Sequence, residues 1–260
     1  MIRLAAGGAT ATLDPDAGGR LASLVVAGRE RLVTDGPGPT MWGCFPMAPW
    51  AGRVRDGRFR WAGATHQLPR RLPPHALHGT VLDRPWTVES TDGAGAVLSA
   101  PLGPGWPWPG RARQELRLRP EGLDLRLEVH ADGDPFPASC GWHPWFRRPV
   151  ELELDAESLW QRDATDIPTG ELVPAPASVE GLDDCLTGLR RPPRLRWPDG
   201  LVLDVVSDCE HVVVFTEPEH ARCVEPQTGP PDALTLAPTV VGPDPLVATA
   251  TFAWEATRPT

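Results

Sequence analysis

Residues 121–130 read EGLDLRLEVH, and this decapeptide decides the class of fold that the sequence predicts. Leucine or valine occupies every second position from Leu123 to Val129, and Asp, Arg and Glu fill the positions between them. Successive side chains of a β-strand point to opposite faces, so a period of two indicates a strand with one buried face. The stretch therefore predicts a half-buried β-strand.

The rest of the chain continues this pattern. Five more short runs have strand character and are bounded by Gly, Pro or Asp: residues 20–26, 113–119, 201–206, 211–215 and 247–254. The 26 glycines and 32 prolines are spread along the chain, and no stretch of ten or more residues combines a helical period with capping residues. Many short strands separated by turns predict an all-β fold, a large antiparallel β-sandwich.

Two irregular segments, residues 98–110 and 164–181, interrupt the strand pattern. Strand-like sequence continues on both sides of each, so we interpret them as long surface loops and not as domain boundaries. A β-sandwich of roughly 200–250 residues is often one unit. We therefore expect a single domain over residues 1–260.

Composition excludes several classes of partner. The formal net charge of -9 leaves no excess of basic residues to neutralise phosphates, which argues against a nucleic-acid partner. No apolar run approaches the roughly 18 residues of a membrane span, and the N-terminal segment lacks the apolar region of a secretory signal. We expect a soluble cytoplasmic protein that does not bind membranes, with a monomer and a homodimer both open.

The five cysteines are odd in number, widely spaced and form no C-x-x-C pair: Cys44, Cys140, Cys185, Cys209 and Cys223. This pattern favours reduced, mostly buried thiols over a disulfide scaffold or a zinc site.

Two early segments hold polar side chains that local structure does not require. In MAPWAGRVRDGRF, residues 47–59, Arg53 follows a rigid Pro-Trp pair, which could aim its guanidinium at two hydroxyls; the alternative is a surface arginine in a turn. In PPHALHG, residues 73–79, His75 and His78 lie three apart in a predicted loop. A metal pair there lacks a third ligand nearby, so ligand-binding and purely structural roles stay open.

Two later segments carry a candidate acid and a candidate base. In SCGWHPWF, residues 139–146, His143 stands among aromatic residues in an extended X-Pro context, where burial would tune its pKa. In RCVEPQTGPPDAL, residues 222–234, Glu225 ends a strand-like run before a rigid turn, which suits the mounting of a general base. A packed core histidine and a solvated edge glutamate are the alternatives.

Taken in order, these motifs resemble the aldose 1-epimerase (galactose mutarotase-like) family. They are Gly-Arg in a Pro-Trp loop, Leu-His-Gly, His-Pro-aromatic-Phe, a late Leu-Asp-Asp, and Glu-Pro-x-Thr-Gly-Pro-Pro-Asp-Ala. The resemblance extends from Gly18 to Trp254 and implies a large β-sandwich with a sugar cleft on one sheet. It implies no cofactor and no metal.

The resemblance also implies a role for each residue. Glu225 corresponds to the general base and His143 to the general acid, while His78, Arg53 and Asp183 correspond to the groups that bind the sugar ring and its hydroxyls. We prefer His78 over His75, and Asp183 over the neighbouring aspartate. Mutarotation removes a proton from the anomeric hydroxyl and adds one to the ring oxygen, so we expect base and acid at opposite edges of one hexose-sized hollow.

Two alternatives accompany this hypothesis. One is a hexose-6-phosphate 1-epimerase of the same fold, with a phosphate bound by some of the arginines at positions 55, 70, 71 and 84. The other is a non-catalytic carbohydrate-binding protein, although a pure binder needs no acid and base pair. Tryptophans such as Trp42, Trp50, Trp142 and Trp145 could cover a sugar face, but core packing is the simpler interpretation for most of them.

Overall fold

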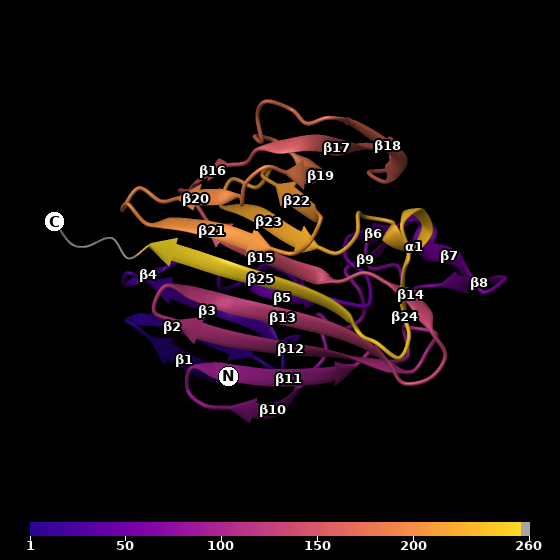
Figure 1. Ribbon diagram of the computed structural model, residues 1–260, viewed down its shortest axis with the longest axis horizontal. Coiled ribbons are helices and arrows are strands. Elements are labelled where there is room, and N and C mark those ends of the chain that lie inside the picture. The colour runs from indigo at the N-terminus through magenta and orange to yellow at the C-terminus, as the bar shows by residue number, and fades with distance from the viewer. Residues whose placement is uncertain (256–260) are drawn as a thin grey trace.

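The computed structural model describes residues 1–255, which form two large antiparallel sheets with almost no helix (Figure 1). This confirms the predicted all-β sandwich. The first sheet has eleven strands in the order β1 (Ile2–Ala6), β2 (Ala9–Asp14), β3 (Arg20–Val26), β5 (Cys44–Met47), β15 (Gly141–Arg147), β23 (Ala221–Gln227), β22 (His211–Phe215), β19 (Asp183–Leu189), β17 (Ala156–Arg162) and β18 (Pro168–Pro174), with β4 (Arg29–Glu30) paired to β3.

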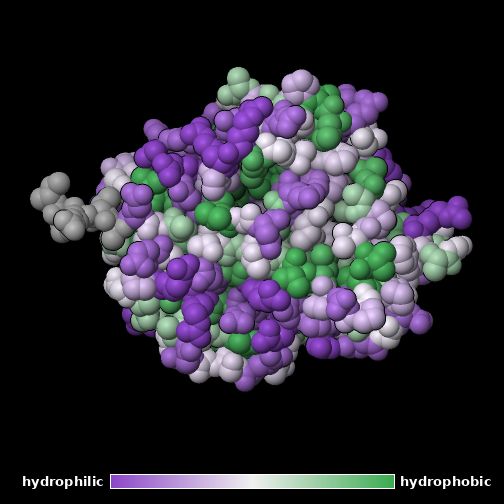
Figure 2. Space-filling view, viewed as in Figure 1, coloured by the Kyte–Doolittle hydropathy of each residue, from purple (hydrophilic) through white to green (hydrophobic). Residues whose placement is uncertain are grey.

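The second sheet has eight strands, in the order β10 (Thr87–Thr91), β11 (Gly95–Pro101), β12 (Gly110–Arg119), β13 (Gly122–Ala131), β25 (Leu246–Glu255), β21 (Val202–Ser207), β20 (Arg194–Arg196) and β16 (Glu151–Glu153). Figure 2, which views the molecule from the side of this sheet, shows hydrophilic side chains over much of the face. An antiparallel sheet with one packed and one solvated face has this alternation.

Three short strand pairs and two single helical turns complete the fold. The pairs are β6 (Arg53–Val54) with β9 (Ala76–Leu77), β7 (Arg58–Trp61) with β8 (Ala64–Gln67), and β14 (Phe136–Ala138) with β24 (Thr239–Val241); the helical turns are η1 (Arg55–Gly57) and α1 (Ala233–Leu236). No helix in residues 1–255 is long and apolar enough to cross a membrane.

All of the decapeptide except Glu121 lies in β13, in the middle of the second sheet. Its four inward side chains, from Leu123 to Val129, are at most 2% exposed and join a buried cluster that also takes Leu4, Leu13 and Leu24 from the first sheet. All five other predicted runs lie in or largely overlap strands β3, β12, β21, β22 and β25. The period of two thus identified the strands that make the core.

The two segments interpreted as long loops are shorter than expected, and this prediction was wrong in part. Residues 98–101 belong to β11, whose alternate side chains Ala96, Leu98 and Ala100 point into the core. Residues 168–174 form β18, an edge strand, where prolines are tolerated because one row of N–H groups needs no partner. The proline content concealed both strands. The part of the predicted single domain at residues 256–260 lies outside the described residues.

The central strands of the first sheet bury both faces. One face of β15 carries Trp142 and Phe146 into the main core, and the other carries His143 and Trp145. Trp145 belongs to a second, smaller apolar cluster with Phe45 and Met47 of β5 and Cys223 of β23. The candidate site is built on this second face.

Candidate functional site

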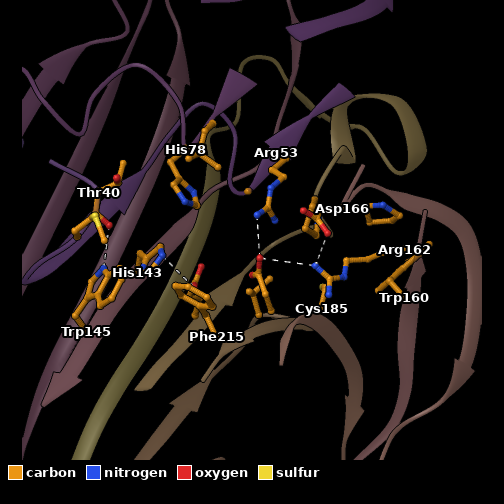
Figure 3. A pocket seen from close by; sticks show the side chains of 18 residues that line it. Thr40, Arg53, His78, His143, Trp145, Trp160, Arg162, Asp166, Cys185 and Phe215 are labelled. Carbon is orange, nitrogen blue, oxygen red and sulfur yellow. Dashed lines mark hydrogen bonds and ion pairs between the residues drawn. The ribbon is translucent and has the colours of Figure 1, made fainter. Parts of the chain in front are cut away.

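A cavity of about 190 Å³ lies over strands β15, β23, β22 and β19, and the loops around β6 and β9 form its other side. Clefts that take drug-sized ligands measure about 300–1,000 Å³, so this hollow suits one small molecule. Its wall includes the five predicted site residues, Arg53, His78, His143, Asp183 and Glu225. In Figure 3, His143 and Trp145 lie at one end of the cavity and Arg162 and Trp160 at the other.

His143 and Glu225 are in direct contact. Strands β15 and β23 pair at Gly141↔Gln227 and at Trp145↔Cys223, which puts the two residues at matching positions between these pairs. His143 Nε2 lies 3.2 Å from Glu225 Oε1, and the side chains are only 6% and 3% exposed. The expectation that they occupy opposite edges of the hollow was therefore wrong. The anomeric and ring oxygens of an aldose are both bonded to C1, so the groups that serve them need to be neighbours.

Burial pushes this pair toward its uncharged form. Removal from water lowers the pKa of His143 to about 3. It raises the pKa of Glu225 well above its usual value, and the negative charge of Asp183 adds to the increase. Both shifts favour the uncharged forms, a neutral carboxyl and a neutral imidazole. Of the two groups, burial thus favours a proton on the carboxyl over one on the imidazole.

Arg53 and Asp183 form an ion pair on the cavity wall. Arg53 Nη2 lies 2.9 Å from Asp183 Oδ2, and each side chain is 19% exposed. The neighbouring Gly52 has φ +68° and packs against Pro231, and the β6–β9 pairing puts Arg53 opposite Leu77, next to His78. Asp183 lines the cavity, as we preferred.

His78 also lines the cavity, held by an unusual backbone turn. Its own φ is +55°, and the following Gly79 has φ +76°, where a side chain would collide with the Ala48 carbonyl oxygen at 2.0 Å. The centroid of its imidazole ring lies 5.1 Å from the centroid of the His143 ring, and the two rings meet edge to face. Burial and the neighbouring His143 lower the pKa of His78 well below its usual value. A neutral imidazole is the form that both donates and accepts hydrogen bonds.

His75, the other candidate histidine, has a structural role. The backbone N–H of Asp56 donates to its Nδ1 at 3.1 Å. Its Nε2 must then carry the proton, and it donates to the Thr165 carbonyl at 3.0 Å. His75 therefore joins the loop before β7 to the β17–β18 turn and does not face the cavity.

Several lining residues were missed by the sequence reasoning. The β17–β18 hairpin contributes Trp160, Arg162, Asp166 and Pro168 to the wall, and Phe215 of β22 closes another side. Arg162 ends β17 and Asp166 lies in the irregular stretch that follows, and neither belongs to a recognisable motif. Only the folded structure, which brings both residues to the cavity, identifies them as part of the site.

Three buried groups have the spacing of metal ligands, since the ligand atoms of His143, Cys223 and Glu225 lie within 4.8 Å of one another. Burial raises the pKa of the Cys223 thiol well above its usual value, so the sulfur keeps its proton. A thiol is a poor metal ligand because metals bind the thiolate. The donor set therefore fits an acid and base pair better than a metal site.

The remaining candidates are accounted for by packing. All five cysteines are buried and free, as predicted. Trp50 and Trp142 are core residues, whereas Trp145 lines the cavity. Among the residues that the structure describes, the arginines at positions 55, 70, 71 and 84 do not line it.

Comparison with known proteins identifies relatives for almost the whole chain. A model of the family described as aldose 1-epimerase matches residues 1–249. The uncharacterized Escherichia coli protein YphB is 30% identical over 118 residues, and the match covers 44% of this chain and only 40% of that protein.

Solved structures share the fold at low sequence identity. A galactose mutarotase-like protein from Clostridium acetobutylicum superposes with a TM-score of 0.85 at 18% identity, covering 98% of this chain and 95% of that one. An aldose epimerase homologue from C. elegans gives 0.85 at 17%, covering 99% of both chains. Galactose 1-epimerase from Lactobacillus acidophilus gives 0.80 at 17%, covering 96% and 92%.

Proposed function

This chain belongs to the aldose 1-epimerase family, and from that premise we propose that it is a mutarotase, which interconverts the α and β anomers of a hexose. The observation that carries the proposal is the contact of 3.2 Å between His143 Nε2 and Glu225 Oε1 on the wall of a small cavity. The anomeric oxygen and the ring oxygen are both bonded to C1, so an acid and a base that exchange protons with them need to lie side by side, as His143 and Glu225 do.

In the proposed reaction, Glu225 is the base and His143 the acid. The Glu225 carboxylate takes the proton of the anomeric hydroxyl, and the His143 imidazolium gives a proton to the ring oxygen. The C1–ring oxygen bond breaks, its electron pair stays on the ring oxygen, and C1 becomes an aldehyde. Rotation about the C1–C2 bond exposes the other face of the aldehyde, and the reverse transfers reclose the ring as the other anomer.

The directions of the two pKa shifts suit this cycle. After ring opening, Glu225 is a neutral carboxyl and His143 a neutral imidazole, the forms toward which burial shifts both pKa values. On reclosure Glu225 gives its proton to the carbonyl oxygen and His143 takes one from the ring hydroxyl, which restores the ring-opening form. The pair keeps one proton in total throughout, so no metal or cofactor is required. Each positioned transfer contributes roughly 10²–10⁴-fold.

Sugar binding falls to the other lining groups. We propose that Arg53 and Asp183, whose ion pair fixes both side chains, bind ring hydroxyls as donor and acceptor. His78 has an Nδ1 without a partner in the described residues and is placed to bind the ring next to His143. Trp145 and Phe215 supply apolar surface for the C–H face of the sugar.

The site offers little support for the two alternatives, a hexose-6-phosphate 1-epimerase and a non-catalytic carbohydrate-binding protein. Arg55 is paired with Asp163 and Arg71 with Asp83, away from the cavity, so neither supplies a phosphate subsite. A pure sugar binder has no use for a buried acid and base in contact. The cytoplasmic location, the absence of nucleic-acid and membrane partners, and the monomer or homodimer state stay predictions.

Polarimetry tests the proposal. Freshly dissolved α-glucose and α-galactose should reach the equilibrium rotation faster with the protein than in buffer. Glu225→Gln and His143→Asn should each reduce the catalysed rate by at least about 10²-fold, with sugar binding still measurable by tryptophan fluorescence. Rotation no faster than buffer for every aldose and aldose phosphate, with binding intact, would instead favour the carbohydrate-binding protein.

A further inference from the structure

The end of the cavity opposite His143 is formed by the β17–β18 hairpin, and its charges are arranged around Arg162 (Figure 3). Arg162 Nε lies 2.6 Å from Asp184 Oδ1, and Nη1 lies 3.0 Å from Asp166 Oδ1 and 3.8 Å from Asp183 Oδ2. We call Arg162 with these three aspartates the Arg162 wall. No motif of the family resemblance includes Arg162 or Asp166.

The guanidinium in this wall is already occupied by carboxylates. Three aspartates surround Arg162, and the one other arginine of the described cavity lining, Arg53, is bound to Asp183 at 2.9 Å. Two carboxylates and two guanidiniums line this end of the cavity, and Asp184, which is not part of the lining, adds a third carboxylate to Arg162, so the local charge is negative. Sugar hydroxyls donate to carboxylates, whereas a phosphate or carboxylate group on the sugar would meet like charge.

We propose that the Arg162 wall restricts this site to uncharged aldoses and that Asp166 is the specificity-determining residue that excludes anionic sugars. The inference rests on the proposed mutarotase function and names its substrate class. Arg162 acts as a positioning residue, which holds the hydroxyl-binding carboxylate of Asp183 between two guanidiniums. Asp166 stands at the rim, where its side chain is 56% exposed, and there it meets the incoming sugar.

Asp166→Asn provides a sharp test because the backbone tolerates it. Asp166 has φ +60°, a left-handed conformation that asparagine adopts as readily as aspartate. The change removes one negative charge and leaves part of Arg162 free for an anion. The control is Asp155→Asn, which removes the same charge from a surface ion pair, that of Asp155 with Arg190, outside the cavity.

The measurement is kcat/KM for glucose and for glucose 6-phosphate by polarimetry, with binding of both measured by tryptophan fluorescence. We expect the wild type to prefer glucose by at least about tenfold. Asp166→Asn should reduce that preference about tenfold, a change of about 1.4 kcal/mol, through a rise in kcat/KM for glucose 6-phosphate. Asp155→Asn should leave the preference unchanged.

The outcomes separate this inference from the proposed function. Equal or better turnover of the phosphate by the wild type, or equal effects of Asp166→Asn and Asp155→Asn, would overturn the role of the wall while the mutarotase stands. If the protein interconverts no aldose, the proposed mutarotase function is wrong. The ratio of the affinities for glucose and glucose 6-phosphate then tests by itself whether the Arg162 wall excludes anionic sugars. If the protein binds neither sugar, both the mutarotase function and the role of the Arg162 wall are overturned.

Discussion

The indole of Trp145 lies face to face with the imidazole of His143, with ring centroids 5.3 Å apart and planes inclined by 8°. Phe45 stacks on the imidazole too, at 4.8 Å and 27°. Trp145 is anchored by its Nε1–H, which donates to the Thr40 carbonyl at 3.1 Å. His143 is thus packed by aromatic rings in an orientation that directs Nε2 at Glu225.

We expect Trp145→Phe to lower kcat about tenfold with KM little changed. A phenyl ring covers less of the imidazole and has no anchor to Thr40, so His143 gains freedom, and a misplacement of 1 Å costs on the order of 10²-fold in rate. Trp142→Phe is the control, since Trp142 is equally buried on the same strand but faces the main core. Stopped-flow polarimetry of both variants should separate them; an equal loss would mean that fold stability is responsible.

The pH profile of kcat/KM should be flat where histidines usually titrate. It reports the free enzyme, in which the His143 pKa is lowered to about 3 and the Glu225 pKa is raised, so the pair keeps its one proton between these limits. The neighbouring His78 is neutral as well, and Arg53 and Asp183 stay paired. Between pH 5 and 7 we expect less than a twofold change after subtraction of the buffer rate. An inflection near pH 6.5 would show that His143 is solvated, against this account.

The sequence was informative about the fold wherever one strand face is apolar and the other polar. The period of two located β12, β13 and β25, because burial of one face imposes that pattern on any sequence. It failed for β18, an exposed edge strand whose side chains are mostly solvated and whose prolines do not disturb a ladder. The sequence of such an edge strand therefore shows no alternation of apolar and polar residues.

The site was predictable only where a motif was present. The family motifs identified Arg53, His78, His143, Asp183 and Glu225, all of which line one cavity. The contact between acid and base could not be foreseen, because it follows from strand register across 82 positions of sequence, from His143 to Glu225. Arg162 lies on β17 and reaches the site only through pairing of that strand with β19.

Different substitutions of the two neighbouring histidines should have different effects. His78→Asn keeps a residue that accepts the left-handed backbone but removes the imidazole from the cavity. We expect KM for the sugar to rise about tenfold, the equivalent of one net hydrogen bond of about 1.4 kcal/mol, with kcat changed much less.

His75→Ala should instead lower stability by about 2 kcal/mol, because two hydrogen bonds to backbone groups are lost and each contributes about 1 kcal/mol. Urea denaturation and initial-rate kinetics of the two variants provide the comparison. A large KM effect in His75→Ala with full stability would contradict the assignment of His78 to the cavity.

Glu225→Gln should make the protein inactive and more stable at neutral pH. The folded-state pKa of Glu225 is raised, so its stabilising contribution is complete below the unfolded value of 4.5 and is lost as pH rises toward the folded pKa. In that interval the folded chain holds a proton that the unfolded chain has released, and stability falls by about 1.4 kcal/mol per pH unit. Glutamine has nearly the same shape and no proton to lose.

The difference in unfolding free energy between variant and wild type, measured in urea from pH 4.5 upward, should therefore grow with pH. The control Glu217→Gln, at an exposed position, should show no such trend; a difference for Glu225→Gln that is constant with pH would mean that the carboxyl is ionised in the folded protein.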